Sequence, residues 1–112
     1  MLRDPQSYLW DVVNAAESIM RMMQDVTCEQ YAATEIIHSA VERKFEIIGE
    51  ALTQLRKADP DLAARVPDIG RIISFRNLLA HGYAFVQHRR VWQLIHDELP
   101  ALRLAASNIL AE

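Results

Sequence analysis

The sequence contains few of the residues that form turns or cross-links. It has three glycines, four prolines and one cysteine, Cys28, among its 112 residues. A single cysteine excludes an internal disulfide and fits a reducing compartment. The scarcity of glycine and proline favours a few long helices over a fold rich in loops.

Long apolar runs are also missing. No run approaches the roughly 18 residues that a membrane-spanning helix needs, and no basic-then-apolar leader is present. We therefore expect a cytoplasmic protein that does not associate with membranes. With 51% apolar and 24% charged residues, the chain can bury one hydrophobic core, and we expect a single domain over residues 1–112.

Apolar residues recur at helical spacing along most of the chain, and no segment alternates as a strand does. The expected helices cover about residues 5–24, 35–57, 69–81 and 88–98, with a last helix from residue 100 and short helical pieces between them. This pattern predicts an all-α, up-and-down bundle of four main helices plus short helices.

Two local signals mark how these helices begin and pack. Asp4-Pro5 is typical of a helix start, and Thr27 with Gln30 resembles a capping box. Gly49 lies in the middle of the second long helix, where it costs about 1 kcal/mol relative to alanine. We therefore expect another backbone to approach closely at Gly49.

The negative net charge of −3 is unevenly distributed. Residues 69–96 contain no acidic residue but carry Arg71, Arg76, Arg89 and Arg90. A local positive field is what a polyanion site requires, because phosphate contacts supply most of the affinity for nucleic acids. Arg71, Arg89 and Arg90 are therefore candidate RNA-binding residues, with chance clustering as the alternative.

Residues 76–83 combine groups that suit phosphodiester cleavage. They are expected to end an amphipathic helix at Gly82. The imidazole of His81 could transfer protons, because its ordinary pKa of about 6.5 lies near working pH. The guanidinium of Arg76 could bind phosphate oxygens as a fork of donors. This chemistry needs no metal or other cofactor in principle, and a structural role for each residue stays open.

The spacing of this pair also predicts an assembly. Five positions along a helix place Arg76 and His81 about 140° apart, so one chain does not readily direct both at one phosphate. A two-fold axis beside the helix would bring both residues of two copies around one cleft. We therefore expect a homodimer.

Residues 76–83 resemble the R-x-x-x-x-H-x-Y signature of the HepT-like toxins, a branch of the HEPN ribonuclease superfamily. Residues 41–51, which read VERKFEIIGEA, are similar to that family's V-x-R-x-x-E-I-I-G-E-A helix. The resemblance continues through residues 91–92 and 99–100. It therefore spans roughly residues 5–105.

This resemblance implies an HEPN-like helical domain and a metal-independent endoribonuclease, with a composite site of Arg76 and His81 at a homodimer interface. Apart from the resemblance, Asn77 lies one turn before His81 and could orient its ring or contact phosphate, with a purely structural amide as the alternative. The resemblance further implies the toxin of a type VII-like toxin–antitoxin pair. In such pairs a minimal nucleotidyltransferase antitoxin of the MntA type neutralises the toxin by transferring AMP to a tyrosine, here Tyr83.

Three further residues match the family's second motif and are supporting candidates. Arg43 and Glu46 can form an ion pair at i, i+3. Glu50 could orient Arg76 or His81 from a neighbouring helix. A solvated acidic face is the alternative for Glu50.

Two functions from other classes remain as alternatives. The same fold could be a non-catalytic, nucleotide- or substrate-binding companion of a nucleotidyltransferase, since fold alone does not decide function. Residues 35–38, which contain Glu35 and His38, form an E-x-x-H like those of di-iron bundles. Such a site needs a second copy of the motif, and the sequence has none.

Overall fold

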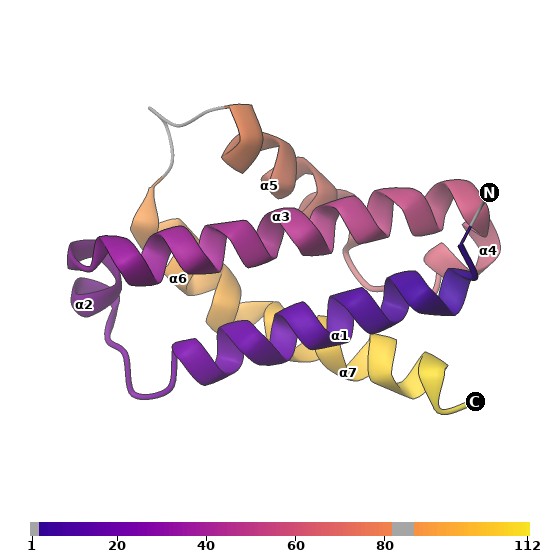
Figure 1. Ribbon diagram of the computed structural model, residues 1–112, viewed down its shortest axis with the longest axis horizontal. Helices are drawn as coiled ribbons and strands as arrows, with labels where there is room; N and C mark the ends of the chain where they lie inside the picture. Colours follow the sequence, from indigo (N-terminus) through magenta and orange to yellow (C-terminus); the bar gives the residue numbers. More distant parts are fainter. Residues whose placement is uncertain (1–2, 82–86) are drawn as a thin grey trace.

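The described part of this computed structural model, residues 3–81 and 87–112, forms seven helices and no strand (Figure 1). The helices are α1 (Pro5–Met22), α2 (Cys28–Ala33), α3 (Glu35–Ala58), α4 (Pro60–Ala63), α5 (Ile69–His81), α6 (His88–Asp97) and α7 (Leu99–Leu110). The prediction of an all-α fold is confirmed. None of the helices in these residues is both long and apolar enough to cross a membrane.

The two longest helices, α1 and α3, lie side by side and run in opposite directions (Figure 1). α7 packs along α1, and α5 packs on α3. The core fills the space between them with buried side chains that include Leu9, Val12, Ile19, Val41, Phe45, Ile48, Leu52, Leu55 and Leu102. α1 begins and α7 ends at the same end of the bundle.

Polar side chains cap the first turns of α1 and α2, as the sequence predicts. The Asp4 side chain accepts a hydrogen bond from the Gln6 amide at 2.9 Å, and Pro5 is the first helical residue. The Thr27 hydroxyl accepts from the Gln30 amide at 3.1 Å, while the Gln30 side chain accepts from the Thr27 amide at 2.9 Å. This capping box stabilises the start of α2, which precedes α3 in the chain as a separate helix.

The side chain of Arg76 lies against α3 at Gly49. A Cβ atom at position 49 would lie 2.2 Å from Arg76 Cβ and 2.3 Å from Arg76 Cγ. The expected close approach at Gly49 is therefore present, but the prediction that a backbone makes it is wrong. The stem of an arginine from α5 fills the space, because a residue without a side chain leaves room for it on the surface of α3.

We expect Gly49→Ala to destabilise the protein, although alanine is the better helix former. The new methyl group would overlap with Arg76 Cβ, which is fixed to the α5 backbone and cannot rotate away. Overpacking costs about 1–3 kcal/mol and helix propensity returns about 1 kcal/mol, so a net loss of up to about 2 kcal/mol in the free energy of unfolding should appear in chemical unfolding.

Gly70→Ala is the matched control. Gly70 is exposed near the start of α5, and a Cβ there would meet nothing within 4 Å. This variant should be as stable as the wild type or slightly more stable. Equal effects of the two substitutions would contradict the packing role of Gly49.

Candidate functional site

The guanidinium of Arg76 is held from two sides at the protein surface. Its Nη2 donates to Glu50 Oε2 on α3 at 3.2 Å, forming an ion pair. Its Nη1 donates to the amide oxygen of Asn77 at 3.2 Å. Arg76 Nε is buried and has no partner among the described residues. The two hydrogen bonds to Glu50 and Asn77 fix the direction of the guanidinium. Because the side chain is 29% exposed, a ligand can still reach it.

Arg76 lies at the edge of a groove of about 430 Å³ that α1, α3 and α5 form. Four residues singled out in the sequence meet here: Arg43, Glu46, Glu50 and Arg76. Arg43 Nη1 lies 3.3 Å from Glu46 Oε2, which is the ion pair that their spacing on one helix predicted. The groove thus joins residues 41–51 on α3 to α5, the helix that carries Arg76.

The groove also contains residues that the sequence did not reveal. Arg3 forms an ion pair with Asp11 at 2.8 Å, and its guanidinium lies 4.8 Å from the centroid of the Tyr8 ring. All three line the groove. Tyr8 and Asp11 share one face of α1, but only the packing of α1 on α3 brings that face next to Arg43 and Arg76.

Electrostatically, the groove is balanced. Each of its three arginines has an acidic partner from the same chain: Arg3 with Asp11, Arg43 with Glu46, and Arg76 with Glu50. A phosphate that enters the groove must therefore compete with carboxylates for the guanidinium groups. Since all these pairs are partly exposed, water and salt weaken them.

The other basic candidates lie on a different surface. Arg71 forms an ion pair with Glu98 at 2.7 Å. Glu98 lies two positions after the end of the basic segment, residues 69–96. Arg71 and Arg90 line a second groove between α5 and α6, with Phe75 among its walls. Arg89 is exposed on α6. The positive segment of the sequence is therefore divided between two faces.

The remaining motif residues are only partly described. His81 is the last residue of α5, on the same helix as Arg76. The side chain of His81, and all of Gly82 and Tyr83, lie outside the described residues. Within the described part of the chain, the one group of three possible metal ligands lies elsewhere, between α3 and α6; it contains His38 but not Glu35.

The helical bundle, with Arg76 and His81 five positions apart on α5, is consistent with an HEPN-like protein. Residues 12–109 match the family described as “Ribonuclease HepT-like”. The chain belongs to this family, as the motif at residues 76–83 predicted. Ribonuclease activity is thereby supported at the level of the family.

Curated relatives of similar length carry names of the same kind. “Putative RNase MJ1380” from Methanocaldococcus jannaschii is 25% identical over 90% of this chain and 92% of its own length. “Putative RNase TTE0752” from Caldanaerobacter subterraneus is 28% identical over 97% and 96%. “Probable ribonuclease HepT” from Thermococcus cleftensis is 29% identical over 92% and 93%. No solved structure matches the chain significantly.

We expect Glu50 to act as a positioning residue for Arg76, so that Glu50→Ala lowers the RNA cleavage rate by about 10- to 100-fold through a misdirected guanidinium. Glu50→Gln should keep most of the activity, because its amide oxygen still accepts from Arg76. Cleavage of a fluorescent RNA under single-turnover conditions measures both rates.

Glu17→Ala provides the control, since Glu17 pairs with Arg103 at 3.3 Å and does not line the Arg76 groove. It should cleave at the wild-type rate. Faster cleavage by both Glu50 variants would instead mean that this carboxylate mainly repels phosphate.

Proposed function

We propose that this protein is a metal-independent endoribonuclease and the toxin of a toxin–antitoxin pair. The observation that carries the proposal is the setting of Arg76 in a chain of the HepT-like ribonuclease family. Its stem is seated against Gly49, and its guanidinium is held at the edge of a groove. The same helix ends at His81.

The proposed reaction needs proton transfer and charge stabilisation. One imidazole takes the proton of the RNA 2′-hydroxyl as its oxygen attacks phosphorus. A second imidazole gives a proton to the 5′-oxygen as the P–O5′ bond breaks, which leaves a cyclic 2′,3′-phosphate. Arg76 stabilises the negative charge that grows on the phosphate oxygens. Because guanidinium and imidazole supply both functions, no metal is required at the phosphate.

A homodimer would provide the two imidazoles. A two-fold axis beside α5 would place Arg76 and His81 of both copies around one strand of RNA. We propose that Arg71, Arg89 and Arg90 contact phosphates away from the cut site, with the salt dependence that such contacts carry.

We propose Tyr83 as the regulatory residue and a minimal nucleotidyltransferase of the MntA type as the partner. Transfer of AMP would join the α-phosphate to the phenol oxygen of Tyr83 and release pyrophosphate from ATP. The adduct would add bulk and negative charge two positions from His81. A phosphate group at that point repels the RNA backbone, which accounts for neutralisation of the toxin.

Replacing either proposed catalytic residue should abolish most cleavage. Loss of one donor to a developing oxyanion costs about 10²- to 10³-fold, and loss of a general acid or base about 10²- to 10⁴-fold. We therefore expect Arg76→Ala and His81→Ala to leave RNA almost intact in the presence of EDTA, while the wild type cleaves it. Arg56→Ala, an exposed arginine on α3, should remain active.

Sedimentation of the same samples should show dimers, and a wild type that stays monomeric at micromolar concentration would contradict the shared cleft. If the wild-type dimer leaves all RNA intact and does not differ from His81→Ala, the protein is instead a binding companion of the transferase.

Tyr83→Phe should separate the ribonuclease activity from its regulation by the transferase. The variant lacks the phenol oxygen that accepts AMP, so it should cleave RNA like the wild type yet remain toxic when the transferase is co-expressed. Growth curves and the mass of the peptide that contains Tyr83 measure the two effects. Rescue of growth by the transferase in cells that express Tyr83→Phe would contradict the assignment.

A further inference from the structure

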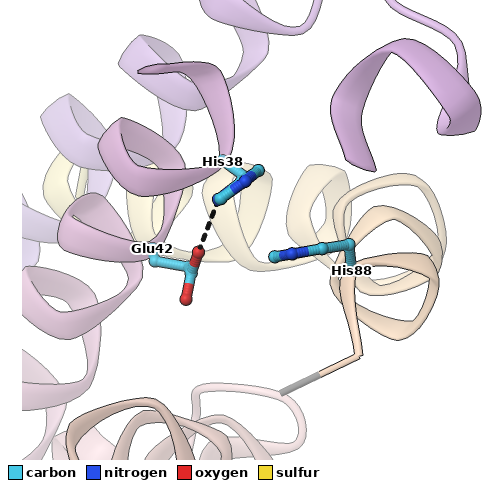
Figure 2. Close-up of side chains that lie close together, drawn as sticks. All are labelled: His38, Glu42 and His88. Carbon is cyan, nitrogen blue, oxygen red and sulfur yellow. Dashed lines mark hydrogen bonds and ion pairs between the residues drawn. The ribbon is translucent and has the colours of Figure 1, made fainter. Parts of the chain in front are cut away.

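A second cluster of functional groups lies between α3 and α6, away from the Arg76 groove. Figure 2 shows His38, Glu42 and His88 with their side chains directed toward one another. His38 and Glu42 lie one turn apart on α3, and His88 is the first residue of α6. One nitrogen or oxygen of each residue lies within 4.8 Å of the others.

The contacts within the cluster leave some of its polar atoms unsatisfied. His38 Nδ1 lies 3.3 Å from Glu42 Oε2, and the two imidazole rings stack with centroids 4.0 Å apart. His88 Nδ1 is buried and has no hydrogen-bond partner among the described residues. Burial of a polar atom without a partner is unfavourable, so packing alone does not account for this arrangement.

Tyr31 closes the cluster from the α2 side. Its ring meets both histidine rings edge-on, with centroids 6.1 Å from His38 and 6.0 Å from His88. Burial, with a smaller effect from the charge of Glu42, raises the pKa of the Tyr31 hydroxyl above its usual range. Its buried hydroxyl, which has no partner in the described part of the chain, can donate to an oxygen at the cluster.

We propose that His38, Glu42 and His88 bind a divalent first-row transition metal ion, with zinc as the reference ion. Two imidazoles and one carboxylate are ligands that such ions accept, with a water molecule in a fourth position. The buried Nδ1 of His88 and the buried Tyr31 hydroxyl, both without a partner among the described residues, fit this assignment. The site goes beyond the proposed ribonuclease function and does not depend on it.

The geometry requires little rearrangement. With metal–ligand bonds of about 2.0–2.2 Å, tetrahedral ligand atoms lie about 3.3 Å apart. His38 Nδ1 and Glu42 Oε2 already have this separation. The ligand atoms of the three residues lie within 4.8 Å of one another, so the largest gap to close, relative to about 3.3 Å, is about 1.5 Å, which rotation about side-chain torsions can provide. Coordination then replaces the stacked arrangement of the two rings.

A metal ion here would join α6 to α3. α6 packs mainly against α2 and α7, and its first residue would gain a direct link to the long central helix. The ion would therefore have a structural role, because it would fix where α6 begins. It would take no part in the chemistry at Arg76, since none of its three ligands lines that groove.

Metal binding by the untagged, chelator-treated full chain tests the proposal. Calorimetric titration with zinc chloride should show one site per chain, and zinc should raise the Tm. Cobalt(II) should give the visible absorption bands of a low-coordinate site with nitrogen ligands. His38→Gln and His88→Gln should each weaken zinc binding by at least about 10- to 100-fold. That is the loss seen when a residue that only hydrogen-bonds to a metal ligand is replaced, and a ligand itself should matter at least as much.

His96→Gln is the matched control on the same helix. His96 stacks near Trp92 and its Nδ1 lies 2.8 Å from the Trp92 carbonyl oxygen, outside the cluster. It should bind zinc like the wild type. Glu42→Gln keeps the shape of the third proposed ligand but removes its charge. It should therefore fold like the wild type and bind zinc more weakly, so the test does not depend on the histidine variants alone. No zinc binding by the wild type, or equal binding by the ligand variants and His96→Gln, overturns the proposal.

Discussion

The contact between Gly49 and the stem of Arg76 is the constraint on which the rest of the site depends. It lets α5 approach α3 closely, because the helix surface at Gly49 has no side chain to displace. The same contact determines where the guanidinium emerges, next to Glu50 and at the edge of the groove. A single packing arrangement therefore holds two helices together and directs the group that a phosphate would meet.

The charges of the groove are balanced within one chain. The arginines of the groove are neutralised by carboxylates of the same chain, although the pairs are exposed enough to be exchanged for other partners. A polyanion would bind weakly to such a surface. Two grooves brought together by symmetry, as in the proposed dimer, would double the arginines and the carboxylates alike, so a bound phosphate would still have to displace carboxylates from the guanidinium groups.

Much of the fold follows from local sequence. Apolar spacing predicted the long helices to within about two residues, and Asp4 and the Thr27–Gln30 pair predicted helix starts that the structure contains. These features depend on neighbours in sequence, and a reader of the chain can recognise them directly. The all-α class and the family followed from the same level of information.

The site was less predictable because its contacts join distant parts of the chain. Arg3, Tyr8 and Asp11 gave no signal, since they reach the groove only when α1 packs on α3. Arg71 was expected to be available for RNA, but Glu98 pairs with it from beyond the basic segment. The E-x-x-H pattern identified His38 but not Glu42, one turn further along the same helix, or His88, which comes from another helix.

The arrangement of the chain ends has a practical consequence. α1 begins and α7 ends near the same pole of the bundle, whereas the start of α6 lies toward the other pole (Figure 1). A fluorophore, an affinity handle or a fused domain attached at either terminus would therefore extend away from the first turn of α6. Tethering the protein to a sensor surface by its ends would leave that region facing the solution.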